Sequence, residues 1–388
     1  MSRPVVRILT AAWPGPTRPR RARFLETLHR ATLDHFECEV LAPLVYESDP
    51  ANEERHGIHV QRFPYPSGGA TVKSRGISPL AAAAYCASMV LAARERWSDR
   101  SREQARGGCV FAHWVVPAGW IAARVAKRLQ LPLVLYAHGS DVNVYARSMV
   151  GRRMLRSALH RASLLFVASH ALAEVVRSLV RPPPPIVVLP VGVDGDFSAA
   201  DAPPTFDGTL RVLFVGDPID AKGAPLVARA MSECHGRGVA VRLDWIGRGD
   251  SDEAPEGVGT MRGDLSAAEV RDAMTTAHLL LLPSQNEGTP LVLQEAIACA
   301  LPWAATPVGG IPALADQFPG GTLLPLPTDS DAVVQAIVAL VVRYVSEGAE
   351  GVRSRWRAMA AVDTHELTVA ARTQIFIKHM HEVLEWAS

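Results

Sequence analysis

The chain has 388 residues, with 40 Lys and Arg against 39 Asp and Glu and a formal charge of +1. This balance excludes an acidic tail or a uniformly basic nucleic-acid binder, but the average hides a split. Residues 1–195 carry 26 basic and 14 acidic side chains, a net charge of +12, whereas residues 196–388 carry 14 and 25, a net charge of −11. Such an asymmetry indicates a surface-binding function in one half of the chain.

The length and the 48% hydrophobic content predict a globular protein of two domains, at roughly 150 residues per domain. The five cysteines are scattered and form no C-x-x-C pair, so we expect reduced thiols, a cytoplasmic location and no disulfide frame. The first residues predict a strand and lack the apolar core that is typical of a signal peptide. The apolar run 79–93 is too short for a bilayer span, which needs about 20 residues, and predicts a buried helix.

Short apolar or β-branched runs alternate with longer helical patterns, which is typical of parallel sheets covered on both faces. In the first half, the predicted strands are 5–12, 38–42, 59–63, 109–113, 133–138, 164–169 and 186–190. The predicted helices there are 21–35, 117–129, 148–162 and 171–179. Residues 196–208 lose this periodicity and gain Pro, Asp and small residues, which predicts a linker.

The same architecture is predicted again after the linker. The expected strands are 210–215, 241–246, 279–283, 303–305 and 322–324, and the expected helices are 224–234, 267–276, 290–300 and 331–346. We therefore expect an α/β protein with two doubly wound, Rossmann-like domains, 1–195 and 209–364, that bind ligands at the carboxyl ends of their strands. An amphipathic helix in 365–388 follows a complete domain, and packing back on the first domain would bury its apolar face.

The strongest local signal is the segment 279–300, LLLLPSQNEGTPLVLQEAIACA. It predicts a buried strand, a loop, and a helix with Thr289 as its N-cap and Pro290 as its first residue. Glu287 lies just before this helix, and Glu295 sits about 7.5 Å along it. Because Glu295 is the one charge on an apolar helix, it is unfavourable there unless something pairs with it.

The free amides of Gly288, Leu291 and Val292 predict an anion site at the positive end of the helix. Two carboxylates on either side of an anion site suit a nucleotide sugar, which joins sugar hydroxyls, a diphosphate and a ribose. The alternative is that Glu295 pairs with a buried arginine and Glu287 is a solvated loop charge.

This segment resembles the E-x7-E motif of the retaining, group 1 nucleotide-sugar glycosyltransferases of GT-B fold. Four further segments resemble the family in the same order: HWVVPAGWIAARVAKRLQLPLVLYAHGSD (113–141), LPVGVDGDF (189–197), RVLFVGDPIDAKG (211–223) and PVGGIPAL (307–314). The resemblance covers most of the chain. It implies a GT-B fold with an acceptor-binding domain first and a nucleotide-sugar-binding domain second.

The resemblance also implies roles for individual residues. Glu287 would contact the donor sugar, Lys222 the diphosphate, and His138, in AHGSD, the catalytic centre near the sugar and the acceptor. The implied catalytic residues are His138, Glu287 and Lys222, and the implied donor-binding residues are Gly15, Gly216, Asp217, Lys222, Glu287, Gly288, Thr289, Pro290, Leu291 and Glu295, the last on the ribose. His113, which ends an apolar strand, and Asp141 are candidates for the acceptor site.

Two of these positions depart from the family pattern. Asp217 stands where most relatives carry Arg beside the phosphates, and an acid there repels a diphosphate unless it points away. Gly15 lies between two prolines after the first strand, where the family shows a Gly-rich loop. For Lys222, the alternative to a phosphate contact is an ordinary surface lysine in a Lys-Gly turn.

The resemblance implies no metal and no cofactor, because helix amides and Lys222 would stabilise the departing phosphate. The pair Asp194 and Asp196 has the D-x-D spacing of metal–diphosphate sites in the other glycosyltransferase fold, but it sits in the predicted interdomain turn. Five arginines punctuate the predicted helix 148–162 or flank it, and four more follow the first strand: Arg147, Arg152, Arg153, Arg156 and Arg161, and Arg18, Arg20, Arg21 and Arg23. A basic amphipathic helix can lie on an anionic membrane or be a solvated surface helix, and both interpretations stay open.

The sequence therefore predicts a metal-independent, retaining transferase that moves a sugar from a nucleotide-sugar donor to the hydroxyl of a glycan, lipid-linked or small-molecule acceptor. Nucleic acid is not expected as a partner, because aromatic residues make up only 6% and no nucleic-acid-binding motif is present. The alternatives are a binding or scaffold protein that has lost turnover, which Asp217 favours, and a sugar-nucleotide epimerase of the same fold.

Overall fold

The computed structural model describes residues 3–18, 22–65, 79–97, 108–247, 259–263 and 265–386, and the chain divides into two compact units. Unit 1 comprises Met1–Gly192 and Val369–Ser388, and unit 2 comprises Val193–Thr368. The predicted linker 196–208 therefore belongs to unit 2. Phe197 in this segment, and Val193 just before it, are buried in the core of that unit.

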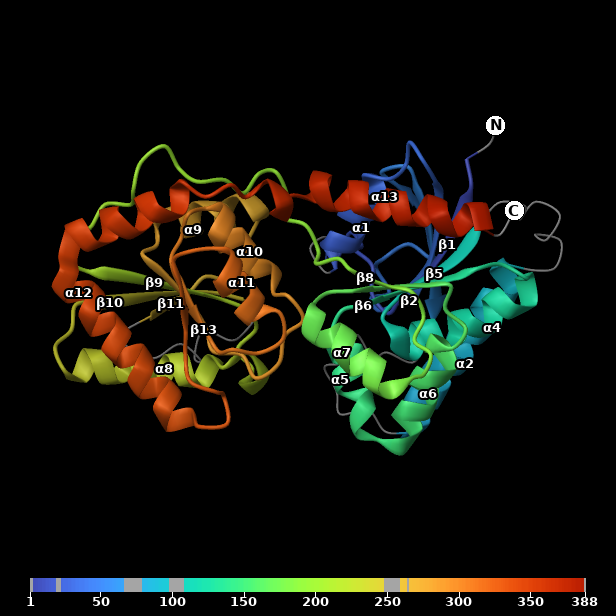
Figure 1. Ribbon diagram of the computed structural model, residues 1–388, viewed down its shortest axis with the longest axis horizontal. Coiled ribbons are helices and arrows are strands. Elements are labelled where there is room, and N and C mark those ends of the chain that lie inside the picture. Colours follow the sequence, from blue (N-terminus) through green and yellow to red (C-terminus); the bar gives the residue numbers. More distant parts are fainter. Residues whose placement is uncertain are drawn as a thin grey trace. The chain divides into compact units, whose positions relative to one another are not determined.

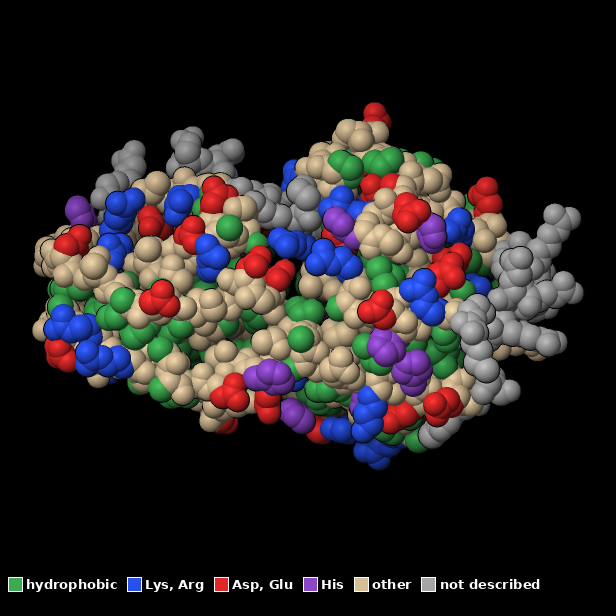
Figure 2. Space-filling view, turned by 90° about the horizontal axis from the view of Figure 1, so that it is seen from above, with side chains coloured by type: hydrophobic (Ala, Val, Ile, Leu, Met, Phe, Trp, Pro, Cys, Tyr) green, Lys and Arg blue, Asp and Glu red, His purple; other side chains and the backbone are tan. Residues whose placement is uncertain are grey.

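The charge split follows the two units. Unit 1 contains 28 basic and 15 acidic residues, a net charge of +13, and unit 2 contains 12 and 24, a net charge of −12. Seen from the side that carries the last helix, acidic and basic side chains are interspersed on the surface of each unit (Figure 2). The excess of each sign is therefore not gathered into one field on this face.

Unit 1 is built on an eight-stranded sheet. Its strands are β1 (Val5–Leu9), β2 (Glu37–Leu44), β3 (Asn52–Arg55), β4 (Ile58–Pro64), β5 (Cys109–His113), β6 (Leu133–Ala137), β7 (Leu164–Val167) and β8 (Ile186–Val188). They lie in the order β3-β4-β2-β1-β5-β6-β7-β8, and all neighbours are parallel except β3 and β4. The chain order reverses direction between β1 and β5, which makes this the switch point of the sheet.

Helices cover both faces of this sheet (Figure 1). They are α1 (Arg23–Arg30), α2 (Pro79–Arg96), α4 (Trp120–Leu129), α5 (Ser140–Asn143), α6 (Met149–Leu159), α7 (His170–Leu179) and α13 (Val369–Trp386). The alternating side chains of the strands divide into two cores: α1 and α13 pack on the face that carries Phe111 and Phe166, while α2, α4, α6 and α7 pack on the other. The C-terminal helix α13 is thus a structural part of unit 1.

Unit 2 has a six-stranded, fully parallel sheet in the order β11-β10-β9-β12-β13-β14. Its strands are β9 (Leu210–Val215), β10 (Val241–Ile246), β11 (Gly259–Met261), β12 (Leu279–Leu282), β13 (Trp303–Ala305) and β14 (Gly321–Leu323), and its helices are α8 (Ala224–Gly236), α9 (Ala267–Thr276), α10 (Leu291–Ala298), α11 (Ile311–Gln317) and α12 (Ser330–Ala360). Helices α9, α10 and α11 pack on one face, and α8 and α12 on the other (Figure 1). This is the strand order 3-2-1-4-5-6 of a doubly wound fold, with its switch point between β9 and β12.

Three local predictions need correction. Helix α2 forms as predicted but is not a buried helix, because only one face, with Tyr85, Met89 and Ala93, enters the core while Leu80 is 81% exposed. Strands β3 and β11 were not predicted. Pro290 is the residue before the helix and not its first residue, since its ψ of 125° is extended, so α10 begins at Leu291 without a side-chain cap.

Helix α12 is, among the described residues, long and apolar enough to cross a membrane by length and composition. Its apolar face is part of the core of unit 2, however, where Val333, Ile337 and Val341 are fully buried. The helix is also interrupted at Gly348, whose φ of 58° and ψ of −151° are not helical. We therefore treat α12 as a core helix of this unit.

Candidate functional site

Each unit has a cluster of polar side chains at the switch point of its own sheet. In unit 2, Lys222 lies on a short turn (Asp220–Lys222) after β9, and Glu287 lies in the loop after the neighbouring strand β12. In unit 1, Gly15 follows β1 and His113 ends the neighbouring strand β5. Ligands of doubly wound sheets bind at these places, because the loops after the two strands diverge there.

The cluster in unit 2 is centred on the carboxylate of Glu287. Lys222 Nζ donates a hydrogen bond to Glu287 Oε1 at 2.8 Å, and the hydroxyl of Ser284 donates to the same oxygen at 2.7 Å. The Glu287 side chain is only 9% exposed, whereas Lys222 is 36% exposed. Glu287 is therefore not a solvated loop charge. The ammonium group remains accessible to an anion from solvent.

Close backbone packing fixes the loop that carries Glu287. Gly310 N–H donates to the carbonyl oxygen of Gly288 at 2.5 Å. Gly309 has a φ of +60°, and a Cβ there would lie 2.1 Å from the carbonyl oxygen of Glu287. Glycine is therefore required at position 309, where the backbone of the PVGG segment packs directly against the Glu287 loop.

Glu295 lies in helix α10, which begins at Leu291 directly after the loop that carries Glu287. The first amides of α10, from Leu291 onward, have no partner within the helix, as at any helix N-terminus. Burial, together with the nearby negative charge of Asp194, raises the pKa of Glu295 to about 7. Among the ion pairs of the described residues none involves Glu295, so pairing with a buried arginine is not observed.

Gly216 and Asp217 come directly after β9. The Gly216 amide continues the sheet by donating to the carbonyl of Ile246, and the Gly216 carbonyl accepts from the indole N–H of Trp245. The Asp217 side chain is exposed. This exposure keeps its carboxylate in water, where its repulsion of a neighbouring anion is weakened.

In unit 1, His138 follows β6 and lies at the centre of an aromatic cluster. Its ring stacks on Tyr136 with centroids 4.5 Å apart, and Phe24 and Trp114 approach within 5.3 and 5.2 Å. His113 Nδ1 is 3.1 Å from His138 Nε2. The register of β5 and β6 explains this contact, because His113 is opposite Tyr136 and His138 is two residues further on the same face.

Asp141 is buried at 3% exposure and organises the turn that carries His138. Its Oδ1 accepts the backbone N–H groups of His138 and Gly139 at 3.0 and 2.9 Å, and its Oδ2 accepts that of Val115 at 2.7 Å. His113 is fully buried. The structure thus gives Asp141 and His113 supporting positions behind His138, and a direct contact of either with an acceptor stays a prediction.

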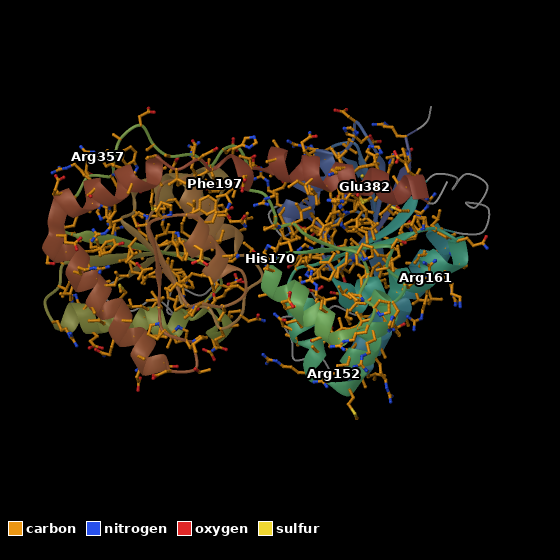
Figure 3. All side chains as sticks on the ribbon, in the orientation of Figure 1. Arg152, Arg161, His170, Phe197, Arg357 and Glu382 are labelled. Carbon is orange, nitrogen blue, oxygen red and sulfur yellow. The ribbon has the colours of Figure 1, made fainter. Side chains whose placement is uncertain are left out.

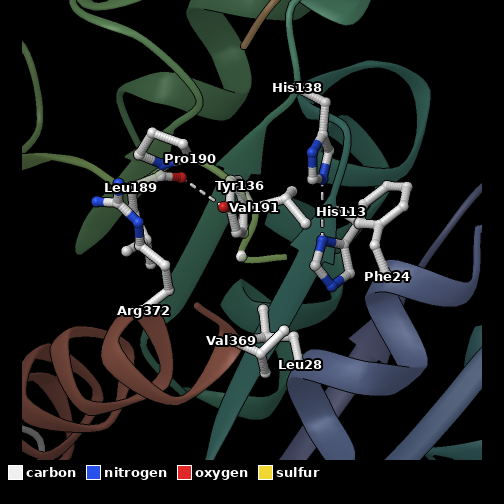
Figure 4. A pocket seen from close by; sticks show the side chains of 11 residues that line it. Phe24, Leu28, His113, Tyr136, His138, Leu189, Pro190, Val191, Val369 and Arg372 are labelled. Atoms are coloured by element: carbon white, nitrogen blue, oxygen red, sulfur yellow. Dashed lines mark hydrogen bonds between the residues drawn. The ribbon is translucent and has the colours of Figure 1, made fainter. Parts of the chain in front are cut away.

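A pocket opens beside this histidine cluster (Figure 4). It is lined by Phe24, Leu28, His113, Tyr136, His138, Leu189, Pro190, Val191, Gly192, Val369 and Arg372. The lining combines apolar side chains with the polar groups of His113, Tyr136, His138 and Arg372. Arg372 comes from α13, more than two hundred residues from His138 in sequence.

Gly15 lies in a loop that is held by side chains of unit 1. Thr17 donates to Asp49 Oδ1 from both its backbone N–H and its hydroxyl, at 2.9 and 2.7 Å, and Arg62 donates to the carbonyl of Pro14. A Cβ on Gly15 would lie 2.5 Å from the Asp49 carboxylate. A larger residue here would therefore displace the Asp49 carboxylate that holds the loop, and the contact of Gly15 with a donor stays a prediction.

Sequence reasoning did not identify Ser284, His29, Tyr136 or Arg372 as part of these clusters. Ser284 could have been found, because it ends a predicted strand three residues before Glu287. The positions of the other three residues depend on which helices cover which face of the sheet.

Among the described residues, no group of three His, Cys, Asp or Glu side chains is arranged to hold a metal ion.

Two family models match the chain and together cover most of it. The model for glycosyl transferases group 1 matches residues 209–342, and that for glycosyltransferase family 4 matches residues 21–197. These ranges correspond to unit 2 and to most of unit 1.

Several named glycosyltransferases are similar to this chain in sequence. The protein provisionally named teichuronic acid biosynthesis glycosyltransferase TuaC, of Bacillus subtilis, is 29% identical over 275 residues, 67% of this chain and 66% of that protein. The D-inositol 3-phosphate glycosyltransferase of Segniliparus rotundus is 30% identical over 297 residues, 66% and 64% of the two chains. The matches thus span about two thirds of the length of these relatives.

Solved structures share the fold over nearly the whole chain. HepE of Anabaena, in complex with UDP-glucose, has a TM-score of 0.72 at 16% identity, covering 97% of this chain and 99% of that chain. Sucrose-phosphate synthase of Thermosynechococcus elongatus also has a TM-score of 0.72 at 16% identity, covering 100% of both chains. With both sequence models, the two parallel-sheet units and these neighbours in agreement, the chain belongs to the group 1 glycosyltransferases of GT-B fold.

Proposed function

We propose that this protein transfers a sugar from a nucleotide-sugar donor to an acceptor hydroxyl, with retention at the anomeric carbon and without a metal ion. The observation that carries this proposal is the cluster of Lys222, Glu287 and Ser284 beside the N-terminus of α10, at the switch point of unit 2. It joins a cation, an acceptor for sugar hydroxyls and a row of backbone amides. These are the groups that a sugar diphosphate requires.

The proposed chemistry is electrostatic. Lys222 and the first amides of α10 stabilise the negative charge that develops on the departing diphosphate. These hydrogen-bond donors are held in place by the fold, so they need not reorient during the reaction. Glu287 orients the donor sugar through its hydroxyls, and Glu295 accepts hydrogen bonds from the ribose. In unit 1, His138 lies beside the pocket that would receive the reacting sugar or the acceptor.

A donor screen tests this function directly. The protein is incubated with a panel of nucleotide sugars, with a lipid fraction or cell extract as the source of acceptor. UDP-glucose comes first, because the structural neighbour HepE is described in complex with it. Release of free nucleotide only in the presence of acceptor supports transfer. Epimerised donor would indicate an epimerase, and tight binding without turnover would indicate a scaffold protein.

Two further measurements test the finer parts of the proposal. The anomeric configuration of the product, measured by NMR, must equal that of the donor if the enzyme retains configuration. Turnover must survive a chelating agent if no metal ion takes part.

The variant Asp217→Arg tests the departure from the family pattern: a sharp rise in activity would mark Asp217 as a defect, and a complete loss would mark it as functional.

We also propose a cytoplasmic location and contact of unit 1 with an anionic membrane surface. Five free cysteines support a reducing compartment. Met149 and Val150 at the start of α6 are 80% and 68% exposed, and Arg147, Arg152, Arg153 and Arg156 are exposed around them, while Arg20 and Arg21 lie outside the described residues. Figure 3 shows Arg152 extending outward from α6. Exposed apolar residues with exposed arginines nearby in the sequence fit the interface of an anionic bilayer, where lipid-linked acceptors are held.

A further inference from the structure

Three histidines of unit 1 form a continuous chain from the core to the pocket. His29 Nε2 is 2.8 Å from His113 Nε2, and His113 Nδ1 is 3.1 Å from His138 Nε2. His29 comes from α1, and both His29 and His113 are fully buried. Figure 4 shows the second of these hydrogen bonds at the wall of the pocket. Because these hydrogen bonds are linked, the ring nitrogen of His29 that carries the proton determines which ring nitrogen of His138 carries one.

The chain permits two arrangements of protons when all three rings are neutral. Burial lowers the pKa of His29 to about 3 and, with its histidine neighbours, holds the pKa of His113 well below its ordinary value, so both rings are neutral. In the outward arrangement, His29 Nε2–H donates to His113, whose Nδ1–H donates to His138 Nε2. His138 then carries its proton on Nδ1. In the inward arrangement every hydrogen bond is reversed, and His138 carries its proton on Nε2.

The surroundings of His29 Nδ1 distinguish the two arrangements. This nitrogen is buried and finds no hydrogen-bond partner among the described residues. The ring of Trp13 lies beside it, with centroids 6.1 Å apart, and the buried indole N–H of Trp13 likewise has no partner there. The inward arrangement would place a second unpaired N–H next to that of Trp13. The outward arrangement places a lone pair there instead, and buried N–H groups without an acceptor are the rarer defect in proteins.

We propose that His29 and His113 are positioning residues that hold His138 in the tautomer with its proton on Nδ1. In that form Nε2 accepts the hydrogen bond from His113, so this nitrogen of His138 cannot remove a proton from an acceptor hydroxyl. The role assigned to His138 in catalysis rests on the proposed glycosyl transfer. The tautomer itself does not, and it can be measured without substrate.

The first test is the ¹⁵N spectrum of the complete protein labelled at its histidine rings, without any substrate. Two-bond ¹H–¹⁵N correlations distinguish a protonated ring nitrogen from a bare one, and a spectrum of His138→Gln identifies the His138 signals. His278 of unit 2 is an internal reference, because its Nδ1 accepts the backbone N–H of Arg211 and its Nε2 faces the Thr205 carbonyl, which can only accept. His138 must show the opposite pattern, with a protonated Nδ1. A bare Nδ1 on His138, or an averaged pair of signals, overturns the proposal.

The second test changes the inner end of the chain. His29→Leu removes the first donor, so the His138 signals must move toward the other tautomer, whereas His29→Gln keeps an N–H near the same position and must preserve the Nδ1–H pattern. The matched control is His59→Leu, an exposed histidine on β4 of the same unit. Thermal unfolding of each variant checks that the fold is intact. If His29→Leu leaves the His138 pattern unchanged, His29 does not set the tautomer.

The activity of the same variants separates this proposal from the proposed function. Turnover of His29→Leu should fall by up to about a hundredfold, the effect of misplacing a catalytic group, and His29→Gln should recover most of it. Nucleotide affinity should not change, because Lys222, Glu287 and Glu295 belong to unit 2. If the tautomer responds as expected but no donor is turned over by the parent protein, the glycosyl transfer fails and the histidine chain stands.

Discussion

At the scale of single residues, the proposed donor site of unit 2 rests on the ion pair between Lys222 and Glu287. The Lys222 side chain pairs with Glu287 and is 36% exposed. We expect Lys222→Met to weaken nucleotide binding by about 1.5–3 kcal/mol, the range for a hydrogen bond to a charged group. Isothermal titration calorimetry with a nucleoside diphosphate measures this change.

The control for that prediction is Lys127→Met, an exposed lysine on α4 of unit 1. It removes the same charge from the molecule without touching the Glu287 cluster. Equal losses of affinity in the two variants would mean that only net charge matters. In that case Lys222 would be an ordinary surface lysine.

The raised pKa of Glu295 predicts a pH-dependent stability. Its ordinary value of 4.5 applies to the unfolded chain and a value of about 7 to the folded one, so the folded state binds the extra proton. The stability contributed by the neutral carboxyl is therefore complete below pH 4.5 and is lost as the pH rises through 7. Glu295→Gln stays neutral at every pH. Its free energy of unfolding should therefore rise relative to that of the parent protein between pH 5 and pH 8, by about 3 kcal/mol at the upper limit.

Chemical denaturation at several pH values measures this difference. Glu174→Gln, at a side chain that is 72% exposed, is the control and should leave the pH profile unchanged. A constant offset between Glu295→Gln and the parent protein across the range would contradict the raised pKa. The same carboxyl group would then have to be ionised in the folded protein below neutral pH.

At the scale of elements, the apolar strands could be predicted and the polar ones could not. β5, β9, β10 and β13 were predicted to the residue, because short buried β-branched or apolar runs between turn residues have few other conformations available. β3 has the sequence NEER and lies at the edge of the sheet, where exposed side chains leave no hydrophobic signal. Only its antiparallel pairing with β4 makes it a strand.

The same limit applies to the site. Glu287, Lys222 and His138 could be predicted because they lie next to strand ends, where local sequence determines their position. His29 and Arg372 could not, because each comes from a helix whose place on the sheet depends on the packing of distant segments. Sequence patterns show that α1 has an apolar face but not which strand that face meets.

Helix α6 yields a prediction about membranes. Removing the exposed apolar pair with Met149→Ser and Val150→Ser, or the arginines with Arg152→Gln and Arg153→Gln, should weaken binding to phosphatidylglycerol vesicles. Each arginine near an anionic surface contributes about 1 kcal/mol, and salt screens this contribution. Sedimentation with vesicles at low and high salt measures the effect.

Leu80→Ser is the matched control for α6. Leu80 is 81% exposed on α2 of the same unit but is not part of the basic helix. If it weakens vesicle binding as much as the α6 variants, exposed apolar surface alone would explain the binding. Equal binding of the parent protein to neutral vesicles would exclude an electrostatic contribution and leave α6 as a solvated surface helix.

At the scale of the whole molecule, opposite charges are separated between units that bind different substrates in the proposed reaction. Unit 2 has a net charge of −12 and must hold an anionic donor through local groups, Lys222 and the amides of α10. Unit 1 has a net charge of +13 and suits an anionic acceptor or membrane surface. What each unit can bind therefore depends on its own net charge, and the total charge of +1 describes neither unit.

The chain also returns to unit 1 at its end, and this connection gives a prediction about folding. Phe376 and Met380 of α13 are fully buried and pack with Phe111 and Phe166 of the sheet. Phe376→Ala should therefore cost unit 1 about 3–5 kcal/mol, a large part of the stability of a domain, through lost burial and the cavity left behind. The transition of unit 2 should not move, because its core contains no residue of α13.

Differential scanning calorimetry, combined with hydrogen exchange to assign each transition, measures the two units separately. Ile375→Ala removes an exposed apolar side chain from the same helix and should change neither transition by more than about 0.5 kcal/mol. A loss confined to unit 2 would contradict the assignment of α13 to unit 1. A loss shared equally by both transitions would mean that the two units unfold as one cooperative body, so that the last helix stabilises the whole chain and not one domain of it.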